Sequence, residues 1–458
     1  MQSRFTRRQL LRLLTAAGLG TPFATRLVSD EADANAPRAT KPENIVVPNT
    51  ARDRYPARFI DGRVIQPERP LSVMHETDVL VVGGGPAGFA AAVAASRAGA
   101  KTALVERYGY LGGLWTGGLV LLVYPTHATE KGVLTKVLRG VGDELLGRIA
   151  RYPDGATRYA DNQPDPTTDP EITKLVMDEM IQEAGVKMFF HCWVADVILE
   201  GNAVRGVVIE SKAGRQAMLA KVVVDASGDG DVFAAAGAEH EQRLHAVGLV
   251  HRLGNADRAD LVKLRAAGFK NLGETEPLPS VKWVNLRGPS TDGLDIAELS
   301  RLEVEHRRSI WKRLEQLRKT SGGEPLFLLQ TAPQIGVRIT RLLAGMRKMT
   351  DPEARSTEPH PDAIAIGGTY GSGRDKPGFA VPYGAMVPKR LDQLIAAGRC
   401  LDVDTAMVED MRLIATCLLT GHAAGAAAAL AVKDRCCPRD LDVPKLQALL
   451  RNQGAYLR

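Results

Sequence analysis

The sequence predicts an α/β fold with a Rossmann-like parallel sheet and helices packed on it. Residues 78–82 form an apolar run of strand length, which is bounded by Gly83-Gly84-Gly85-Pro86 and followed by an alanine-rich stretch of helical length. A second apolar run, residues 101–106, completes a strand–helix–strand unit. The 458 residues are 45% hydrophobic and 24% charged, a globular balance that suits two or three domains of roughly 150 residues.

The composition excludes several classes of protein. Glycine accounts for 45 residues, about a tenth of the chain against a typical ~7%, and the overall balance excludes disordered, collagen-like and polytopic membrane proteins. The net charge of +6 is scattered, without a basic stripe interleaved with aromatic residues, so no nucleic-acid partner is predicted. Five cysteines are too few for a disulfide framework, and Cys436 and Cys437 are adjacent, so we expect no bridge between them.

The amino-terminal residues 1–36 are predicted to be a targeting segment. Thr6-Arg7-Arg8 precedes a mildly apolar stretch, 13–25, and the small-residue stretch 34–36. This order resembles the twin-arginine signal of bacteria, which implies export of the folded protein by the twin-arginine machinery into the periplasm or beyond. The apolar stretch is shorter than the ~20 residues of a membrane span, so we expect a soluble mature protein. The alternative is a basic amphipathic first helix. Residues 37–74 are predicted to be an irregular lead-in.

Apolar and polar periodicity predicts the remaining elements. Further strands are expected at 186–198, 204–210, 218–225 and 393–398. Helices are expected at 171–184, 295–319 and 411–432. Stretches rich in Pro, Gly and Asp predict surface loops or boundaries at 152–170, 271–293 and 350–378.

The glycine-rich turn after the first strand predicts a dinucleotide site. Gly83-x-Gly85-x-x-Gly88 opens a helix, and Glu106 ends the next strand 18 positions after Gly88. The first glycine permits a tight turn, the second lets the backbone approach a pyrophosphate, and the third allows close helix–strand packing. The helix amino terminus offers N–H groups to phosphates. Glu106 can accept hydrogen bonds from the hydroxyls of an adenosine ribose.

Three further segments favour FAD over NAD. Residues 107–113 are again glycine-rich where an NAD-dependent dehydrogenase would begin another helix. The strand at 222–225 ends in a small-residue turn, and the strand at 394–398 ends in glycine and leads to an alanine-rich helix. A second complete glycine fingerprint for NAD(P)H is absent from the sequence.

These segments together resemble the bacterial FAD-dependent oxidoreductases of the two-domain glutathione-reductase-like class, which are related to fumarate reductase and succinate dehydrogenase flavoproteins. The resemblance runs through 83–113, 222–238, 336–341, 381–389, 396–400 and 411–432. It implies an FAD-binding domain split into residues 75–245 and 381–458, with an inserted α+β substrate or cap domain at 246–380.

The resemblance also implies which residues contact FAD. Gly112 and Gly113 would lie near the flavin, and the backbone of Val194 would contact the adenine. Gly398 and Arg399 would contact the pyrophosphate and the ribityl chain. The helix start around Cys417–Gly421 would face the N1/C2=O edge of the flavin, where a positive helix end suits the charge of the reduced ring. The full predicted set is Gly83, Gly85, Pro86, Ala87, Gly88, Glu106, Arg107, Gly112, Gly113, Val194, Ala226, Gly228, Gly398, Arg399, Cys417 and Gly421.

Two departures from the family pattern matter. Gly384 stands where relatives often have arginine, and Leu114-Trp115 stands where they have small residues, which predicts a reshaped substrate pocket. The residues after Gly113 also lack the histidine with which some relatives hold FAD covalently, so we predict noncovalent FAD.

The candidate catalytic residues are Arg338, Tyr383, Arg412 and His422, with Arg341 as a further candidate. An arginine can bind a carboxylate or neutralise the reduced flavin, and tyrosine or histidine can move a proton. Each has a structural alternative. The arginines can serve as ion-pair partners, Tyr383 as a core residue with a satisfied hydroxyl, and His422 as a buried hydrogen-bonding group.

No metal site is predicted. The spacings of His240, His245 and His251 do not place them on one helix face, and no cysteine or carboxylate cluster completes a set. Cys400 and Cys417 are not in a C-x-x-C arrangement and are expected to be small buried thiols.

The sequence therefore predicts an exported FAD-dependent oxidoreductase that transfers a hydride between a small organic substrate and the flavin N5. Its electron partner would be a quinone, a small carrier or dioxygen. One alternative is a flavin-binding protein or flavin-dependent isomerase without net redox turnover, and another is a NAD-dependent dehydrogenase. The substrate is not identified, because no chemically distinctive cluster occurs in 246–380.

Overall fold

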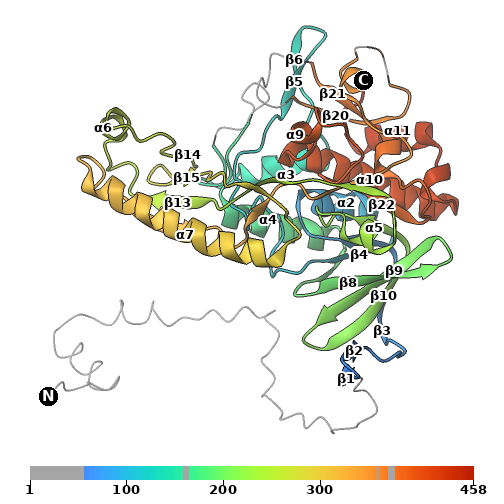
Figure 1. Cartoon of the computed structure of the whole chain (residues 1–458). Coiled ribbons are helices and arrows are strands. Elements are labelled where there is room, and N and C mark those ends of the chain that lie inside the picture. The colour runs from blue at the N-terminus through green and yellow to red at the C-terminus, as the bar shows by residue number, and fades with distance from the viewer. Residues whose placement is uncertain (1–55, 158–164, 357, 359, 370–376) are drawn as a thin grey trace, which may run out of the picture. The chain divides into compact units, whose positions relative to one another are not determined.

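The structure, a computed structural model, describes residues 56–157, 165–356, 358, 360–369 and 377–458 (Figure 1). It contains two compact units, which divide after Arg69. The predicted twin-arginine segment and the first half of the predicted lead-in, residues 37–55, lie outside the described residues. In the first unit, β1 (Arg58–Ile60) and β2 (Arg63–Ile65) form an antiparallel hairpin. Its turn is made by Asp61 and Gly62, which have φ values of 49° and 76°. The prediction of an irregular lead-in was therefore wrong for these residues.

The second unit is built on a seven-stranded sheet. Its strands lie in the order β7 (Lys187–Phe189), β4 (Thr102–Val105), β3 (Val73–Val82), β10 (Gly214–Asp225), β9 (Ala203–Ser211) and β8 (Trp193–Glu200), and β22 (Leu394–Ala396) also pairs with β10. The neighbours β7, β4, β3, β10 and β22 run parallel, whereas β9 and β8 add an antiparallel edge. The predicted α/β class with a largely parallel sheet is confirmed.

One predicted strand is two strands. Residues 186–198 contain β7 and β8, which lie at opposite ends of the sheet order. The chain breaks at His191, which adopts a left-handed φ of 58°. An apolar run does not reveal such a break, because the side chains on both sides of it remain apolar.

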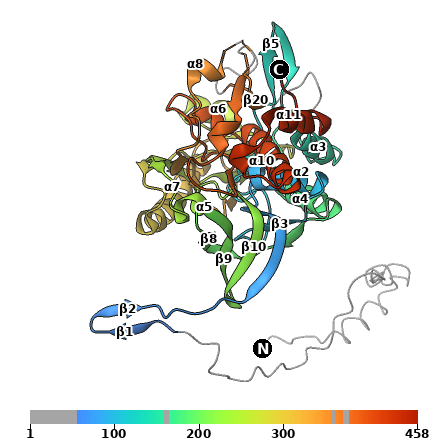
Figure 2. The ribbon, with the colours of Figure 1, turned by 90° about the vertical axis from the view of Figure 1, so that its right-hand side faces the viewer.

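Two alanine-rich helices form the core against the sheet. The helices α2 (Pro86–Arg97) and α10 (Ile414–Asp434) lie beside each other (Figure 2). Their backbones nearly touch, since a Cβ added at Gly421 would lie 2.0 Å from the carbonyl oxygen of Ala87, and one added at Gly425 would lie 2.0 Å from that of Ala91. By length and composition α10 could cross a membrane, but it is wholly buried here. It is therefore the core helix of this unit.

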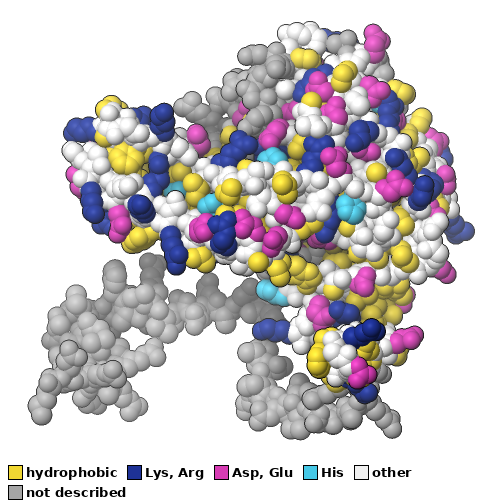
Figure 3. Space-filling model, in the orientation of Figure 1, with side chains coloured by type: hydrophobic (Ala, Val, Ile, Leu, Met, Phe, Trp, Pro, Cys, Tyr) yellow, Lys and Arg dark blue, Asp and Glu magenta, His cyan; other side chains and the backbone are white. Residues whose placement is uncertain are grey.

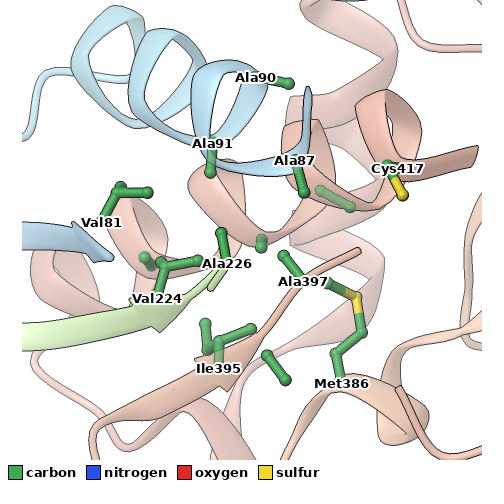
Figure 4. Close-up of a cluster of buried hydrophobic side chains, with 14 of the residues drawn as sticks. Val81, Ala87, Ala90, Ala91, Val224, Ala226, Met386, Ile395, Ala397 and Cys417 are labelled. Atoms are coloured by element: carbon green, nitrogen blue, oxygen red, sulfur yellow. The ribbon is translucent and has the colours of Figure 1, made fainter. Parts of the chain in front are cut away.

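Figure 4 shows how these helices meet the sheet. Side chains of Ala87 and Ala91 from α2 face Ala226 at the end of β10, and Cys417 of α10 lies beside Ala87. Ala397, directly after β22, completes the group. Further helices support this core, namely α3 (Val141–Ile149), α4 (Pro170–Glu183), α5 (Asp231–Ala235), α9 (Val408–Met411) and α11 (Val443–Asn452).

A second group of strands lies under the long helix α7 (Ile296–Lys319) (Figure 1). One sheet has the order β14 (Glu274–Thr275), β15 (Lys282–Val284), β13 (His251–Gly254) and β17 (Phe327–Thr331). Another has the order β16 (Ser290–Thr291), β12 (His245–Gly248) and β18 (Gly336–Val337). Helix α7 contributes to a separate small core in this region, in which its residues Leu314 and Leu317 pack with Leu264 and Leu326.

Several predicted loops contain short regular elements. Residues 271–293 hold β14, β15 and β16, and residues 350–378 hold α8 (Asp351–Ala354) and β20 (Ala363–Gly367), which pairs with β21 (Phe379–Pro382). Strands of two to five residues are too short for a periodic signal and are formed by pairing with distant partners. On the face shown in Figure 3, basic and acidic side chains intermingle.

Candidate cofactor and substrate cavity

A large cavity opens where the parallel strands of the main sheet end. The space free of protein atoms is roughly 1380 Å³ when the open solvent at its mouth is included. Its wall includes residues at the carboxyl ends of β3, β4 and β10 and directly after β22. Ligands of open α/β sheets bind at this edge, because the loops that follow the strands converge there.

The glycine loop between β3 and α2 forms one side of the cavity. Gly83 has a φ of 98°, and a Cβ added to Gly88 would lie 1.7 Å from the carbonyl oxygen of Gly83. A Cβ added to Gly85 would meet nothing within 4 Å. Gly83 and Gly88 are therefore required by backbone packing, whereas Gly85 faces open space at the start of α2. A phosphate can approach the N–H groups of the helix there.

Glu106 holds this loop in place. Its Oε2 accepts a hydrogen bond from the backbone N–H of Gly84 at 2.6 Å, and its Oε1 accepts one from that of Tyr108 at 2.9 Å. Glu106 is buried and lines the cavity. Each carboxylate oxygen keeps a second lone pair, so the same group can also accept ribose hydroxyls. The sequence indicated the ribose role but not the role in fixing the loop.

Arg399 reaches the cavity from the loop after β22. Its Nη2 donates to Oδ1 of Asp229 at 2.9 Å, while its buried Nε has no hydrogen-bond partner among the described residues. A Cβ added to Gly228 would lie 2.4 Å from Nη1 of Arg399, so Gly228 makes room for the guanidinium. A buried N–H without a partner is costly, and an anionic oxygen in the cavity would satisfy it. The loop and Arg399 together suit a pyrophosphate.

At another part of the cavity wall, Arg107 contacts two aromatic rings. The guanidinium carbon of Arg107 lies 5.0 Å from the ring centroid of Tyr108 and 5.0 Å from that of Trp193. All three residues line the cavity, together with Cys192 and Val194. Such contacts are favourable through the charge distribution of the rings. Tyr108 and Trp193 were not predicted as site residues, although each adjoins one that was.

Two glycines and the start of α10 lie at a further part of the wall. Gly113 lines the cavity with a φ of 51°, and a Cβ there would lie 3.0 Å from the Cα of Gly85. Cys417, in the first turn of α10, also lines the cavity. Burial raises the pKa of the Cys417 thiol to about 11, so it remains protonated near neutral pH.

Three predicted cofactor residues do not line the cavity. Gly88 and Gly421 pack against backbone, and a Cβ added to Gly112 would lie 2.4 Å from Oγ1 of Thr116. The other predicted residues line it, namely Gly83, Gly85, Pro86, Ala87, Glu106, Arg107, Gly113, Val194, Ala226, Gly228, Gly398, Arg399 and Cys417.

Two of the candidate catalytic residues, Arg338 and Arg412, line the cavity. Arg338 donates from Nη1 to the carbonyl oxygen of Ala246 at 2.7 Å and from Nη2 to Oδ1 of Asn285 at 3.2 Å. Arg412 forms an ion pair with Glu409, whose Oε1 also accepts a hydrogen bond from Nε2 of His245 at 3.0 Å. The hydrogen bond from His245 and the Arg412 guanidinium lower the pKa of Glu409 to about 2.

The structure does not bring Tyr383, His422 or Arg341 to the cavity wall. Tyr383 is buried and donates to the carbonyl oxygen of Pro438 at 2.8 Å, and burial raises its pKa. His422 donates to Oε1 of Gln453 at 2.8 Å, and burial lowers its pKa to about 4. Arg341 donates to the carbonyl oxygen of Asp229 and to a carboxylate oxygen of Asp231. These contacts are the structural roles that the sequence left open for them.

The described residues contain no group of three or more His, Cys, Asp or Glu side chains that could hold a metal ion. His245 is hydrogen-bonded to Glu409, and burial lowers the pKa of His251 to about 4.

A family model described as FAD dependent oxidoreductase matches residues 78–243 and 253–450. The chain belongs to this family. It is an FAD-dependent enzyme, and FAD is its cofactor. The match covers both the glycine loop and the segment that carries Arg399.

Members of other groups are also similar in part. The thiamine thiazole synthase of Methanococcus vannielii is 31% identical over 163 residues, which are 33% of this chain and 56% of the relative. The chain thus spans about half the length of the curated relatives it matches. Two solved structures each have a TM-score of 0.44. One is a geranylgeranyl bacteriochlorophyll reductase-like protein from Thermoplasma acidophilum (15% identity, 83% of this chain and 84% of that chain), and the other is p-nitrophenol 4-monooxygenase from Pseudomonas putida (13%, 82% and 84%).

The cavity of this FAD dependent oxidoreductase fits its cofactor. The open side of Gly85, the orphaned Nε of Arg399 and the lone pairs of Glu106 match the pyrophosphate and the adenosine ribose. A second stretch of wall is formed by Leu114, Trp115, Val120, Gly248, Val250, Asn285, Gln334, Gly336 and Arg338. Several of these residues come from the region between 246 and 380, in which the sequence showed no chemical cluster.

Proposed function

We propose that this protein is an exported FAD-dependent dehydrogenase or reductase that transfers a hydride between a small organic substrate and the flavin N5. One observation carries the proposal. A single cavity is lined both by the nucleotide loop and by two arginines, Arg338 and Arg412, that have no place in a nucleotide fingerprint. Bound FAD would supply the hydride acceptor or donor, so the protein's task is to bind and orient the substrate.

The residues around the second stretch of wall suit this task. Arg338 and Arg412 would hold an anionic or polar group of the substrate, and Glu409 with His245 would fix Arg412. Leu114, Trp115 and Val250 would exclude water from the reacting carbon. Tyr383 and His422 have no part in this proposal, since their polar atoms face Pro438 and Gln453.

The proposal of export rests on residues 1–36, which resemble a twin-arginine signal. The exported protein would work in the periplasm or outside the cell, where a quinone, a small carrier or dioxygen would exchange electrons with it. The twin-arginine machinery would be its partner in export.

The visible spectrum of the protein purified from the exported fraction tests both parts of the proposal. We expect flavin absorbance at about one FAD per chain, and anaerobic bleaching when a substrate is added. If no organic substrate bleaches the oxidised flavin, and none restores the absorbance of flavin that has been reduced chemically, the result would favour a flavin-binding protein or an isomerase. A colourless protein that binds NAD would favour the nicotinamide alternative.

A further inference from the structure

The two halves of helix α7 differ in charge. Residues 296–306 contain three acidic residues and one basic residue, whereas residues 307–319 contain six basic residues and one acidic residue. In the first half the one basic residue, Arg301, is paired with both Glu298 and Glu305. The positive charge of α7 is therefore concentrated in its carboxyl-terminal half, beside α6 (Leu261–Ala266) (Figure 1).

Contacts within the protein account for only two of these six basic side chains. Arg307 pairs with Glu303 one turn earlier, and Arg313 donates to two carbonyl oxygens of the segment 270–271. Four basic side chains are exposed and have no ion-pair or hydrogen-bond partner among the described residues, namely Arg308, Lys312, Arg318 and Lys319. The last two lie in the final turn, where a positive charge favours the helix dipole, but this effect does not extend to the earlier turns.

The four unpartnered charges surround two exposed apolar side chains. Trp311 is 52% exposed and Val304 is 46% exposed. Residues that are three, four or seven positions apart lie on one side of a helix. Such intervals connect the two apolar residues with the four basic ones, and we call this set the α7 patch: Val304, Arg308, Trp311, Lys312, Arg318 and Lys319. Glu315 is the one acidic residue among 307–319, so the patch keeps a positive charge.

We propose that the α7 patch binds the surface of an anionic phospholipid membrane. The basic groups complement the charge of the lipid headgroups, and the aliphatic stems of Lys and Arg lie along an apolar boundary while their charges stay in water. An exposed tryptophan has an apolar body and a polar N–H, which suits the level of the headgroups. An acidic protein surface would complement the charges equally well, but it would not require the exposed indole and Val304 between them.

Flotation with lipid vesicles tests the proposal. The FAD-loaded, full mature chain is used, so the basic residues of 1–36 do not contribute. One set of vesicles contains phosphatidylglycerol and phosphatidylcholine in equal parts, and the other contains phosphatidylcholine alone. We expect binding to the first set only, and its loss at about 0.5 M salt, where exposed charges are screened. Equal binding to both sets, or binding to neither, would overturn the proposal.

A pair of charge variants shows whether the α7 patch is the contact. Arg308→Gln combined with Lys312→Gln should weaken binding to the anionic vesicles about tenfold or more, because each basic residue near such a surface strengthens binding roughly fivefold. Lys212→Gln combined with Lys389→Gln removes the same charge from exposed residues outside α7 and should leave binding nearly unchanged. One FAD per chain shows that each variant has folded. Equal weakening by both pairs would make the overall charge responsible and would overturn the patch.

Tryptophan fluorescence shows whether the indole of Trp311 reaches the lipid. The sequence has four tryptophans, of which Trp115 and Trp283 are buried and Trp193 lines the FAD cavity. Brominated acyl chains quench a tryptophan only at close range, so they should quench the emission of the bound protein. Trp311→Phe should lose this quenching on vesicles to which it still binds. Quenching that persists in this variant would refute the placement of Trp311 at the membrane.

Poly-L-glutamate probes the alternative of an acidic protein partner. If the polymer binds, the Arg308→Gln and Lys312→Gln pair abolishes that binding, and no vesicle binds, the lipid proposal is overturned in favour of an acidic protein. The inference goes beyond the proposed function, since none of these measurements uses the flavin chemistry. Vesicle binding without substrate bleaching would leave the α7 patch intact, whereas bleaching without vesicle binding would sink the patch alone.

Discussion

The backbone N–H of Gly84 donates to Oε2 of Glu106 at 2.6 Å, and this bond joins the nucleotide loop to the end of the neighbouring strand. Glu106 is therefore placed before any ligand arrives, with one oxygen on Gly84 and the other on Tyr108. A preorganised carboxylate loses less entropy on binding than one that must be ordered by the cofactor.

We expect Glu106→Gln to weaken FAD binding. The amide removes one of the two acceptors and the negative charge, and a hydrogen bond to a charged group contributes about 1.5–3 kcal/mol. The affinity for FAD should fall roughly 10- to 100-fold. Titration of the apoprotein with FAD measures this, with the exposed Glu210→Gln as control. Unchanged affinity would show that Glu106 does not act on the cofactor.

Two glycine substitutions should have opposite consequences. Gly421→Ala places a methyl group 2.0 Å from the carbonyl oxygen of Ala87 and should lower the unfolding free energy of the apoprotein by about 1–3 kcal/mol. Gly85→Ala meets no protein atom, so it should leave that stability within about 1 kcal/mol and weaken FAD binding instead. Urea denaturation and FAD titration of both variants distinguish packing from ligand contact. A large loss of apoprotein stability in Gly85→Ala would refute the distinction.

Tyr383→Phe should leave the rate of flavin reduction unchanged. The hydroxyl bonds to the carbonyl oxygen of Pro438, so its loss should cost about 1 kcal/mol of stability and no chemistry. Arg412→Met, at the cavity wall, should slow reduction by about tenfold or more. Anaerobic stopped-flow with an active substrate gives both rates. Slower reduction in Tyr383→Phe, with full FAD content, would return the tyrosine to the catalytic set.

The stability of the protein should fall as the pH drops from about 6.5 to 4. Burial lowers the pKa of His422 to about 4 from its ordinary 6.5, so in this range the unfolded chain binds a proton that the native protein excludes. The effect of this one residue is roughly 3 kcal/mol once the pH is below both values. In His422→Gln the dependence of the unfolding free energy on pH should be flatter by about one proton. Identical slopes for the two proteins would contradict the buried neutral histidine.

FAD should leave the protein on acid precipitation. The segment after Gly113 reads Leu114-Trp115-Thr116 and offers no histidine for a covalent bond, and the Cys417 thiol is held protonated by burial. The absorbance of the supernatant after trichloroacetic acid treatment measures the released flavin. Yellow colour that remains in the pellet after washing would establish a covalent link.

Local sequence was enough to predict the nucleotide end of the cavity. The glycine loop and Glu106 lie within one strand–helix–strand unit, whose order along the chain is also its order in space. The stretch of wall that we propose binds the substrate was not predictable in this way. Asn285 and Gln334 reach the wall through strand pairings of the short β12, β13 and β18, which have no periodic signal of their own.

Helical geometry explains why His422 was misleading. Cys417 lines the cavity, and His422 lies five residues later on α10, about 140° around the helix axis. Its ring therefore faces Gly140 and Gln453 instead of the cavity. Nearness in sequence to a predicted flavin contact did not determine which way the side chain points.

The pairing of β22 with β10 has a consequence for biosynthesis. Residues 394–396 join a sheet whose other strands end by Asp225, and Arg399 meets Asp229 across 170 positions of the chain. When a ribosome has synthesised the first three quarters of the protein, the glycine loop is therefore already present, whereas Arg399 has not yet been added to the chain. FAD can contact both the glycine loop and Arg399 only when translation is nearly finished, so we expect FAD loading to follow synthesis of the carboxyl-terminal segment.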